Sequence, residues 1–151
     1  MKNSMMVAGV VALAVAGWRY LQPSADVAVK DNRIVTDRLW IDHLPMDPRE
    51  KFDVFAVVTR EKLCFFEKRS RWQMAMDVCR YQLVGDELRT VFPQTETTET
   101  YKVAVTPCKT NGFDYCLEMS GGTRGAKKYY SMKNWVIRGG SIDAQVQSIT
   151  P

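Results

Sequence analysis

The chain has 151 residues, and its 21 Lys and Arg against 17 Asp and Glu give a formal net charge of +4. Two of the basic residues, Lys2 and Arg19, and none of the acidic ones lie in residues 1–24, so the remaining 127 residues have a net charge of only +2. So small an excess argues against nucleic-acid binding, which usually needs a strongly basic stripe. The same 127 residues are enough for one domain with a hydrophobic core and too few for two.

The first predicted element is an uncharged apolar run over residues 5–18, with Lys2 before it and Arg19 after it. A charged start, an apolar centre and the Ala-Val-Ala sequence at 14–16 are typical of an export signal or a short membrane anchor. As a helix these 14 residues span about 21 Å, and residues 5–21 form a longer segment if Arg19 reaches the lipid head groups. The sequence does not decide whether this segment is cleaved off or retained. The alternative to export is that the segment is a buried strand or helix of a cytosolic protein.

The positive charge before this run favours an N-terminus in the cytoplasm and the rest of the chain outside it. We therefore expect an exported protein, either periplasmic or anchored in the membrane and facing the periplasm or the extracellular side. The chain then divides into a signal peptide or membrane anchor with its linker (1–24), a β domain (25–138) and a C-terminal tail (139–151).

The β domain is expected because short segments rich in Val, Phe, Tyr and Thr alternate with turn residues, without long helical patterns. The predicted strands cover residues 33–41, 52–59, 62–66, 72–84, 88–92, 101–106, 113–119 and 127–130. The sequence therefore predicts an all-β fold, a single antiparallel up-and-down barrel or sandwich of about eight strands, preceded by the N-terminal apolar helix. Between the first two strands, Asp47-Pro48-Arg49-Glu50 predicts one helical turn with a capping box.

A first hairpin is predicted at the two-residue turn Gly85-Asp86. Its register pairs Leu83 with Leu88, Tyr81 with Thr90, and Cys79 with Phe92. These residues then face inward, whereas Met74, Met76 and Val78 follow the opposite alternation. A β-bulge near Val78 and Cys79 would bring both halves of this strand to the same face.

A second hairpin is predicted at Asn111-Gly112, with Cys108 directly opposite Cys116. This register pairs Thr106 with Glu118, Val105 with Met119, and Pro107 with Leu117. The apolar members then share one face and the cysteines lie on the other. The geometry of a disulfide and the hydrophobic alternation therefore favour the same register, through a loop of three or five residues.

The four cysteines of an exported chain predict two disulfides, for which three pairings exist. We favour Cys108–Cys116 from the hairpin register and, by elimination, Cys64–Cys79. Free buried thiols and a zinc site are the alternatives. Zinc is disfavoured because no C-x-x-C spacing occurs and His43 is the only histidine. We expect no metal and no cofactor.

The sequence offers little support for catalysis. We expect His43, next to Asp42, to be a hydrogen-bonding surface residue, and no G-x-S-x-G context supplies a nucleophilic serine. A hydrolase using strand carboxylates remains an alternative, with these acids in predicted strands: Glu67, Asp77 and Glu118. The glycine-rich basic stretch 121–128 lacks the spacing of a phosphate loop, so we interpret it as a flexible basic loop, solvated or touching an anionic ligand. We therefore expect that the protein is not an enzyme.

Aromatic and methionine side chains are the remaining candidates for a site. If the barrel is open inside, an apolar cavity is lined by Phe55, Phe66, Trp72, Met74, Met76, Tyr81 and Phe92. The alternative is that these side chains simply fill the core. Both outcomes are compatible with eight strands, since a barrel of that size holds either packed side chains or one small ligand.

The run YQLVGDELRTVFPQ at 81–94, continued by YKVAV at 101–105, resembles the hairpins of small bacterial lipocalin-like (calycin-type) β-barrel proteins. The resemblance implies an up-and-down barrel. We thus expect an exported or membrane-tethered, non-enzymatic module that binds a small apolar ligand or lipid. The alternative is a structural or assembly subunit of a cell-envelope protein complex. Its docking surface would be either exposed strand edges or the C-terminal tail, which contains Ile142, Val146 and Ile149.

Overall fold

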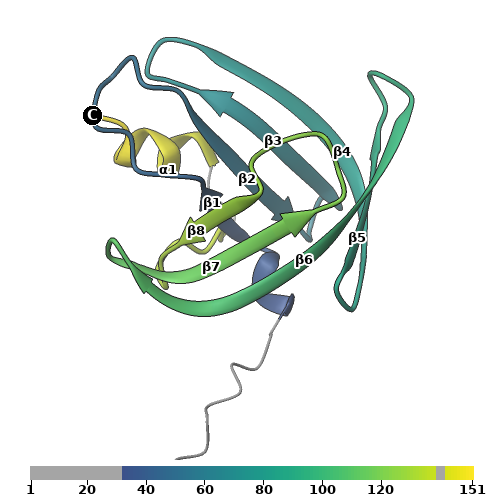
Figure 1. Ribbon diagram of the computed structural model, residues 1–151. Helices are drawn as coiled ribbons and strands as arrows, with labels where there is room; N and C mark the ends of the chain where they lie inside the picture. The colour runs from purple at the N-terminus through teal and green to yellow at the C-terminus, as the bar shows by residue number, and fades with distance from the viewer. Residues whose placement is uncertain (1–31, 139–141) are drawn as a thin grey trace, which may run out of the picture.

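Eight antiparallel strands form a closed barrel in which each strand pairs with the next along the chain and the last pairs with the first (Figure 1). The computed structural model describes residues 32–138 and 142–151. Its strands are β1 (Arg38–Ile41), β2 (Phe52–Val58), β3 (Leu63–Arg69), β4 (Met74–Val84), β5 (Glu87–Phe92), β6 (Thr97–Thr110), β7 (Phe113–Ser120) and β8 (Lys128–Ser131). A 3₁₀ helix, η1 (Asn32–Val35), precedes the barrel, and α1 (Ile142–Ile149) follows it. The predicted all-β up-and-down barrel is confirmed.

The predicted N-terminal apolar segment, residues 5–21, lies outside the described residues, as do all of residues 1–31. Within residues 32–138 and 142–151, no helix is both long enough and apolar enough to cross a membrane.

Two hydrophobic clusters lie on opposite faces of the strands. The first is inside the barrel and receives at least one side chain from every strand, for example Trp40 from β1, Leu88 from β5 and Tyr129 from β8. The second lies outside β1 and β2 and consists of Leu39, Ile41, Phe52, Val54, Phe113, Trp135 and Val146. Strand β1 is therefore buried on both faces.

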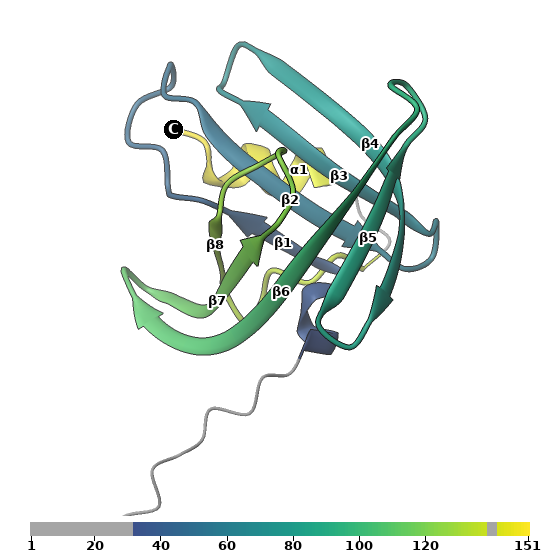
Figure 2. The ribbon, with the colours of Figure 1, turned by 45° about the vertical axis from the view of Figure 1, so that its right-hand side comes forward.

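The C-terminal helix packs on this outer cluster (Figure 2). Val146 is fully buried, and Ile142 and Ile149 pack against the cluster beside it. Residues i, i+4 and i+7 share one face of a helix, which is why these three side chains reach the barrel together. The tail predicted to be a docking surface thus uses its apolar residues to cover the barrel.

The start of the first predicted strand is a 3₁₀ helix instead. In η1 the side chain of Val35 is fully buried, and its carbonyl accepts a hydrogen bond from Trp40 Nε1 at 3.1 Å. The indole N–H inside the barrel thereby obtains its acceptor, as a buried polar group requires. The predicted turn at residues 47–50 is present as a turn rather than a helix, with Glu50 Oε2 accepting a hydrogen bond from the Met46 N–H at 2.7 Å.

The first predicted hairpin has the expected register, with Leu83 opposite Leu88 and Tyr81 opposite Thr90. The bulge predicted near Val78 and Cys79 is wrong, because β4 pairs with β3 in an unbroken register from Arg80 to Met74. Without a bulge the alternation continues, so the two methionines of β4 point away from the interior: Met74 is 55% and Met76 46% exposed.

The second hairpin pairs two residues out of the predicted register. Val105 lies opposite Leu117 rather than Met119, and the register shifts between Pro107 and Thr110. The turn itself has two residues, Asn111 and Gly112, with φ angles of 51° and 83°. A two-residue hairpin turn of this kind needs positive φ at both positions, which Asn-Gly tolerates best. The disulfide residue Cys108 lies within this shifted stretch, close to the turn.

Both favoured disulfides are present: Cys64–Cys79, with Cα atoms 4.9 Å apart, and Cys108–Cys116, with Cα atoms 5.6 Å apart. Cys64 and Cys79 lie directly opposite each other on β3 and β4, fully buried inside the barrel. The second bridge closes the β6–β7 hairpin. Two disulfides in one small domain are typical of an oxidising, extracellular environment.

Candidate ligand-binding sites

Aromatic rings pack against one another inside the barrel, where the sequence left a cavity and a filled core as alternatives. The Phe66 ring lies 4.9 Å from that of Phe55, 5.9 Å from that of Phe92 and 5.4 Å from that of Tyr101, measured between centroids. The Tyr129 ring lies 5.7 Å from that of Phe55. Rings at these separations are in mutual contact, so they occupy the space between the strands.

Of the seven side chains predicted to line a cavity, four contact this interior cluster: Phe55, Phe66, Tyr81 and Phe92. The other three are outside. Met74 and Met76 lie on the outer face of β4, and Trp72, in the β3–β4 turn, is 70% exposed. The structure therefore divides the predicted set because the alternation of β4 continues where a bulge was expected.

The loop between β7 and β8 closes the barrel above these rings. A Cβ atom at Gly122 would lie 2.0 Å from ring atoms of Tyr101, and one at Gly125 would lie 2.2 Å from the Tyr129 hydroxyl. Only glycine allows the backbone to approach the rings so closely. The stretch predicted to be a flexible basic loop is thus packed into the mouth of the barrel.

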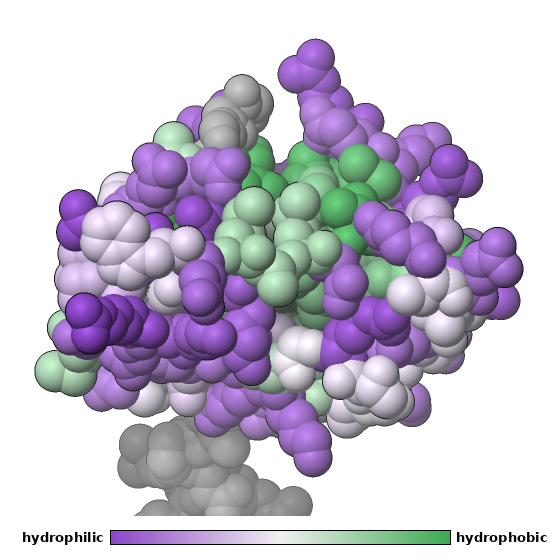
Figure 3. Space-filling model, turned by 90° about the horizontal axis from the view of Figure 1, so that it is seen from above, coloured by the Kyte–Doolittle hydropathy of each residue, from purple (hydrophilic) through white to green (hydrophobic). Residues whose placement is uncertain are grey.

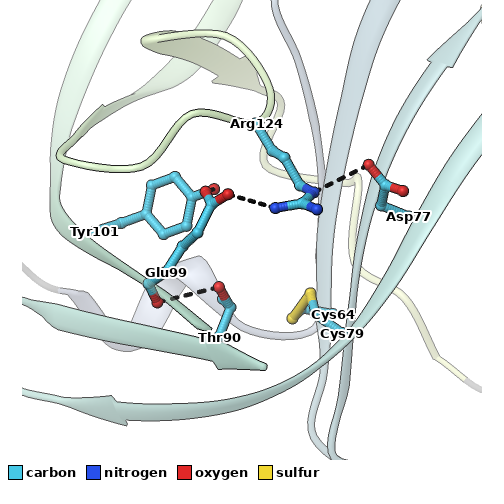
Figure 4. The surroundings of a disulfide bond; sticks show 7 residues. All are labelled: Cys64, Asp77, Cys79, Thr90, Glu99, Tyr101 and Arg124. Atoms are coloured by element: carbon cyan, nitrogen blue, oxygen red, sulfur yellow. Dashed lines mark hydrogen bonds and ion pairs between the residues drawn. A yellow bond between two sulfur atoms is a disulfide. The ribbon is translucent and has the colours of Figure 1, made fainter. Parts of the chain in front are cut away.

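Arg124 of this loop holds the mouth closed through ion pairs with two strands (Figure 4). Its Nη1 donates to Glu99 of β6, and its Nε lies 3.2 Å from Asp77 Oδ2 of β4. The guanidinium carbon also lies 3.8 Å from the centroid of the Phe92 ring, a cation–π contact. The charged end of Arg124 therefore covers the aromatic interior.

Glu99 receives hydrogen bonds from several donors at once. The Tyr101 hydroxyl donates to it, as do the Thr123 N–H at 2.9 Å and the Thr123 hydroxyl at 2.7 Å. Burial acts to raise the pKa of Glu99, but these donors and Arg124 outweigh it and lower the pKa to about 2. Glu99 is therefore ionised at neutral pH and acts as a fixed charge rather than as a proton donor.

A pocket of about 410 Å³ remains beside Arg124, between the ends of β3 and β4 and the β7–β8 loop. Charged groups of both signs line it, including Asp77 and an ion pair between Lys68 Nζ and Asp53 Oδ1 at 3.7 Å. Burial raises the pKa of Asp53, and Lys68 opposes that effect. Only three of its lining side chains are apolar, those of Phe66, Ala75 and Met76, so the pocket offers an apolar ligand little contact.

An apolar groove of about 370 Å³ lies outside the barrel, between the outer face of β2, β3 and β4 and the start of α1. Its apolar lining consists of Val54, Ala56, Val58, Phe65, Met76, Ile137 and Ile142. Seen from above, apolar side chains gather in one area of the surface and polar side chains surround them (Figure 3). The groove volume falls within the range of about 300–1,000 Å³ that is usual for small-molecule sites.

Carboxylates complete the groove. Glu67 of β3 is only 5% exposed, and its Oε1 lies 3.0 Å from Arg69 Nη1, which in turn lies 3.0 Å from Asp143 Oδ1 of α1. Arg69 thereby links the helix to the barrel. Burial raises the pKa of Glu67, and Arg69 opposes that effect. Despite the ion pair, Glu67 Oε1 is a buried oxygen with no hydrogen-bond donor.

Two of the acids considered for hydrolysis, Glu67 and Asp77, line the pocket beside Arg124, and the third, Glu118, is exposed on β7. Glu67 is paired with Arg69 and Asp77 with Arg124, so neither carboxylate is free of a cation. His43 lies between Asp42 and Glu50, with nitrogen–oxygen distances of 3.0 and 3.2 Å, as a partly exposed hydrogen-bonding residue. Among residues 32–138 and 142–151, no cluster of three His, Cys, Asp or Glu side chains is arranged to hold a metal ion.

Comparison with protein-family models, with curated proteins and with solved structures gives no match to this chain. The resemblance to lipocalin-like proteins therefore extends only to the architecture, a closed antiparallel barrel of eight strands.

The outer groove was not predicted, although the sequence contains a signal for it. In β2, the residues Phe52, Val54 and Ala56 alternate with Asp53 and Phe55, so apolar side chains occupy both faces. Such a strand needs a cover on its outer side as well as a core. Combined with the helical spacing of Ile142, Val146 and Ile149, this pattern indicates a helix packed outside β2. The role of Arg124 has no comparable signal, because its partners are distant in sequence.

Proposed function

We propose that this protein is a non-enzymatic binding module for a small apolar ligand or lipid, and that the ligand occupies the outer groove rather than the interior. The observation that carries the proposal is the groove of about 370 Å³ between β2–β4 and α1, with apolar side chains along its length. Aromatic rings and the Arg124 ion pairs occupy the interior and its mouth, which leaves the outer surface as the place for an apolar ligand.

The compartment belongs to the same proposal. Two disulfides and the apolar run at residues 5–18 support an exported protein, either free in the periplasm or tethered through residues 5–21. A lipocalin-like relationship is compatible with the closed barrel of eight strands. A tethered module of this kind would hold its ligand close to the membrane.

The test is a titration of the purified protein with dodecanol, followed by native mass spectrometry and thermal shift. We expect one molecule of the alcohol to bind and to raise the melting temperature, because a ligand that binds only the folded state stabilises it. The variant Val58→Trp fills the groove and is expected to abolish binding. The matched control is Val84→Trp, at a β4 valine that is 66% exposed and outside the groove. Equal binding by both variants would rule out the groove.

Exposed apolar side chains at one end of the barrel favour a second candidate function, that of a docking subunit in an envelope complex. Large apolar side chains are exposed there in two loops: Met46 is 91% and Trp72 70% exposed. The loops are joined, since the Arg71 N–H donates to the Pro48 carbonyl at 3.0 Å. Exposed aromatic and methionine side chains are common in protein interfaces. We expect cross-linking in membranes to capture a stoichiometric protein partner. The Trp72→Ala variant is expected to lose this partner, and the control Val84→Ala is expected to keep it. If Trp72→Ala captures the partner as well as the wild type does, this end of the barrel is not the docking surface.

A further inference from the structure

We propose that the ligand of the outer groove is an amphiphilic amine, whose ammonium group binds at Glu67 while its apolar part lies along the outer face of β2–β4. This inference rests on the proposed function and adds the chemical class of the ligand. It follows from the charges that line the groove and from the bonding of Glu67.

Negative charge predominates in the groove. Four carboxylates line it, those of Asp37, Glu61, Glu67 and Asp143, against the single guanidinium of Arg60. The neighbouring Arg69 pairs with two of these carboxylates and still leaves an excess of negative charge. A concave site lined mostly by one sign of charge attracts ligands of the opposite sign. The charge of the groove thus favours a cation.

Glu67 gives the position of that cation. Its side chain is 95% or more removed from solvent in a groove with apolar walls, and its Oε1 accepts no hydrogen bond although Arg69 lies 3.0 Å away. Buried oxygens are almost always hydrogen-bonded, and Glu67 has only the poorly aligned Arg69 guanidinium as a partner, so a donor that enters the groove improves on this arrangement once the carboxylate turns toward it. An ammonium group has three N–H donors and a positive charge, and it satisfies both needs of this carboxylate.

The neighbours of Glu67 agree with an apolar body for the ligand. On the sheet, Glu67 lies opposite Val54 of β2 and Met76 of β4, and both side chains line the groove. Ile142 forms the opposite wall at the start of α1. A ligand with its amine at Glu67 therefore has apolar contacts on both sides. A fatty acid would instead bring its carboxylate among four others.

The test compares three probes that share a dodecyl chain and differ only in the head group: dodecylamine, dodecanol and dodecanoate. Affinities are measured by isothermal titration calorimetry at neutral pH, below micelle-forming concentrations. We expect the amine to bind at least about tenfold more tightly than the alcohol, since a charge-assisted hydrogen bond is worth that much. Dodecanoate is expected to bind most weakly.

Variants then locate the effect. Glu67→Gln is expected to reduce the affinity for dodecylamine to about that for dodecanol, with little change for dodecanol. Because Glu67→Gln also breaks the ion pair with Arg69 and risks misfolding, Glu61→Gln at the exposed rim provides a second measurement, with a smaller loss expected for the amine only. Glu118→Gln, an exposed glutamate outside the groove, is the matched control.

The outcomes separate the two proposals. Equal affinities for amine and alcohol would overturn the amine inference and leave the groove as a site for neutral apolar ligands. Tighter binding of dodecanoate would likewise overturn it. If none of the three probes binds, the proposed function itself fails. A preference for the amine that survives both Glu67→Gln and Glu61→Gln would place the cation elsewhere and contradict the assignment.

Discussion

At the scale of single residues, the barrel depends on a few charged side chains that neutralise one another at its surface. Glu99 and Arg124 are both mostly buried, with side-chain exposures of 13% and 18%, and each has lost most of its hydration. Such a pair is stable only when the remaining donors and acceptors are satisfied. Tyr101 and Thr123 supply the additional donors to Glu99, which explains why a charged group can cover an aromatic interior.

Acid is therefore expected to weaken the fold through Glu99. Its pKa is lowered from 4.5 to about 2 in the folded state, so the ionised form binds its partners and stabilises the protein fully above pH 4.5. That stabilisation is lost as the pH falls from 4.5 towards 2. We expect Glu99→Gln to lower the melting temperature at pH 7, and the difference from the wild-type protein to close over this interval. Thermal unfolding followed by circular dichroism measures it, with Glu118→Gln as the control.

A constant difference between wild type and Glu99→Gln from pH 7 to pH 2 would contradict the assignment. It would mean that the substitution acts through packing and not through the charge. The other carboxylates with shifted pKa values do not produce the same signature, because burial raises the pKa of Asp53 and of Glu67. Their ionised forms are disfavoured by folding, so their contributions change with pH in the opposite direction.

At the scale of elements, the helix α1 is part of the folded domain. The side chain of Val146 is fully buried in the outer cluster, and Arg69 joins α1 to β3 through Asp143. Both contacts hold the helix beside the groove, of which Ile142 forms a wall. If α1 came away, the groove would lose that wall and Leu39, Ile41 and Phe52 would lose their cover.

Val146→Ala is expected to destabilise the domain by about 2 kcal/mol, because it removes buried methyl groups and leaves a cavity. Chemical denaturation measures this loss as a lower midpoint with an unchanged slope. The control is Gln147→Ala, at an exposed position of the same helix, which is expected to change stability by no more than about 0.5 kcal/mol. Equal stability of Val146→Ala and the wild type would mean that α1 is a detachable tail.

The sequence was sufficient to predict the strands and most of their faces, and insufficient for the β6–β7 register and for the continuous alternation of β4. Strand β2 was expected at 52–59 and covers Phe52–Val58, since its alternation is read directly from the residues. The β6–β7 register was predicted two residues away, with Val105 opposite Met119 instead of Leu117. A shift of two residues keeps every side chain on its face, so the alternation cannot distinguish the two registers. The Asn111-Gly112 turn pairs Thr110 with Phe113, and the register shift between Pro107 and Thr110 then sets the pairing of Val105 with Leu117.

The candidate site was harder to predict than the strands, because it depends on contacts between residues far apart in the sequence. Both a cavity and a filled core were left open for the interior, because the frequency of aromatic residues in the strands does not tell whether their rings leave space or occupy it. The rings of Phe66, Phe92 and Tyr101 pack against one another there. The groove depends on α1 covering β2 from a distance of almost 90 residues in the chain. Glu67 is set in that groove by tertiary contacts alone, which no local pattern reveals.

At the scale of the whole molecule, the strand pair that closes the barrel, β1 with β8, has little backbone pairing. Among the described strands, β1 and β8 share a single paired position, Ile41 with Tyr130, whereas β6 pairs at six positions with β5. The rest of the β1 edge is bonded by the segment after β8: the Leu39 N–H donates to the Trp135 carbonyl at 3.0 Å, and the Ile137 N–H donates to the Asp37 carbonyl at 2.8 Å.

Arg38 reinforces this closure. Its side chain is 9% exposed, its Nη1 donates to the Met132 carbonyl, and its guanidinium carbon lies 4.8 Å from the centroid of the Tyr115 ring. Burial lowers the pKa of Arg38, although the group stays charged at neutral pH because arginine titrates so far above it. One side chain thus links β1, β7 and the segment after β8.

We therefore expect the barrel to open first between β1 and β8. Native-state hydrogen exchange measures the opening, and the amides of β8 are expected to exchange with a lower opening free energy than those of β5 and β6. Arg38→Met is expected to speed exchange in β8 and at residues 132–137 while leaving β5 and β6 unchanged. Arg89→Met, at an exposed arginine of β5, is the control and is expected to alter neither region. Equal protection of β8 and β6 in the wild-type protein would instead mean that the barrel opens as one unit, with the contacts of Arg38 and of residues 135–137 making up for the short β1–β8 pairing.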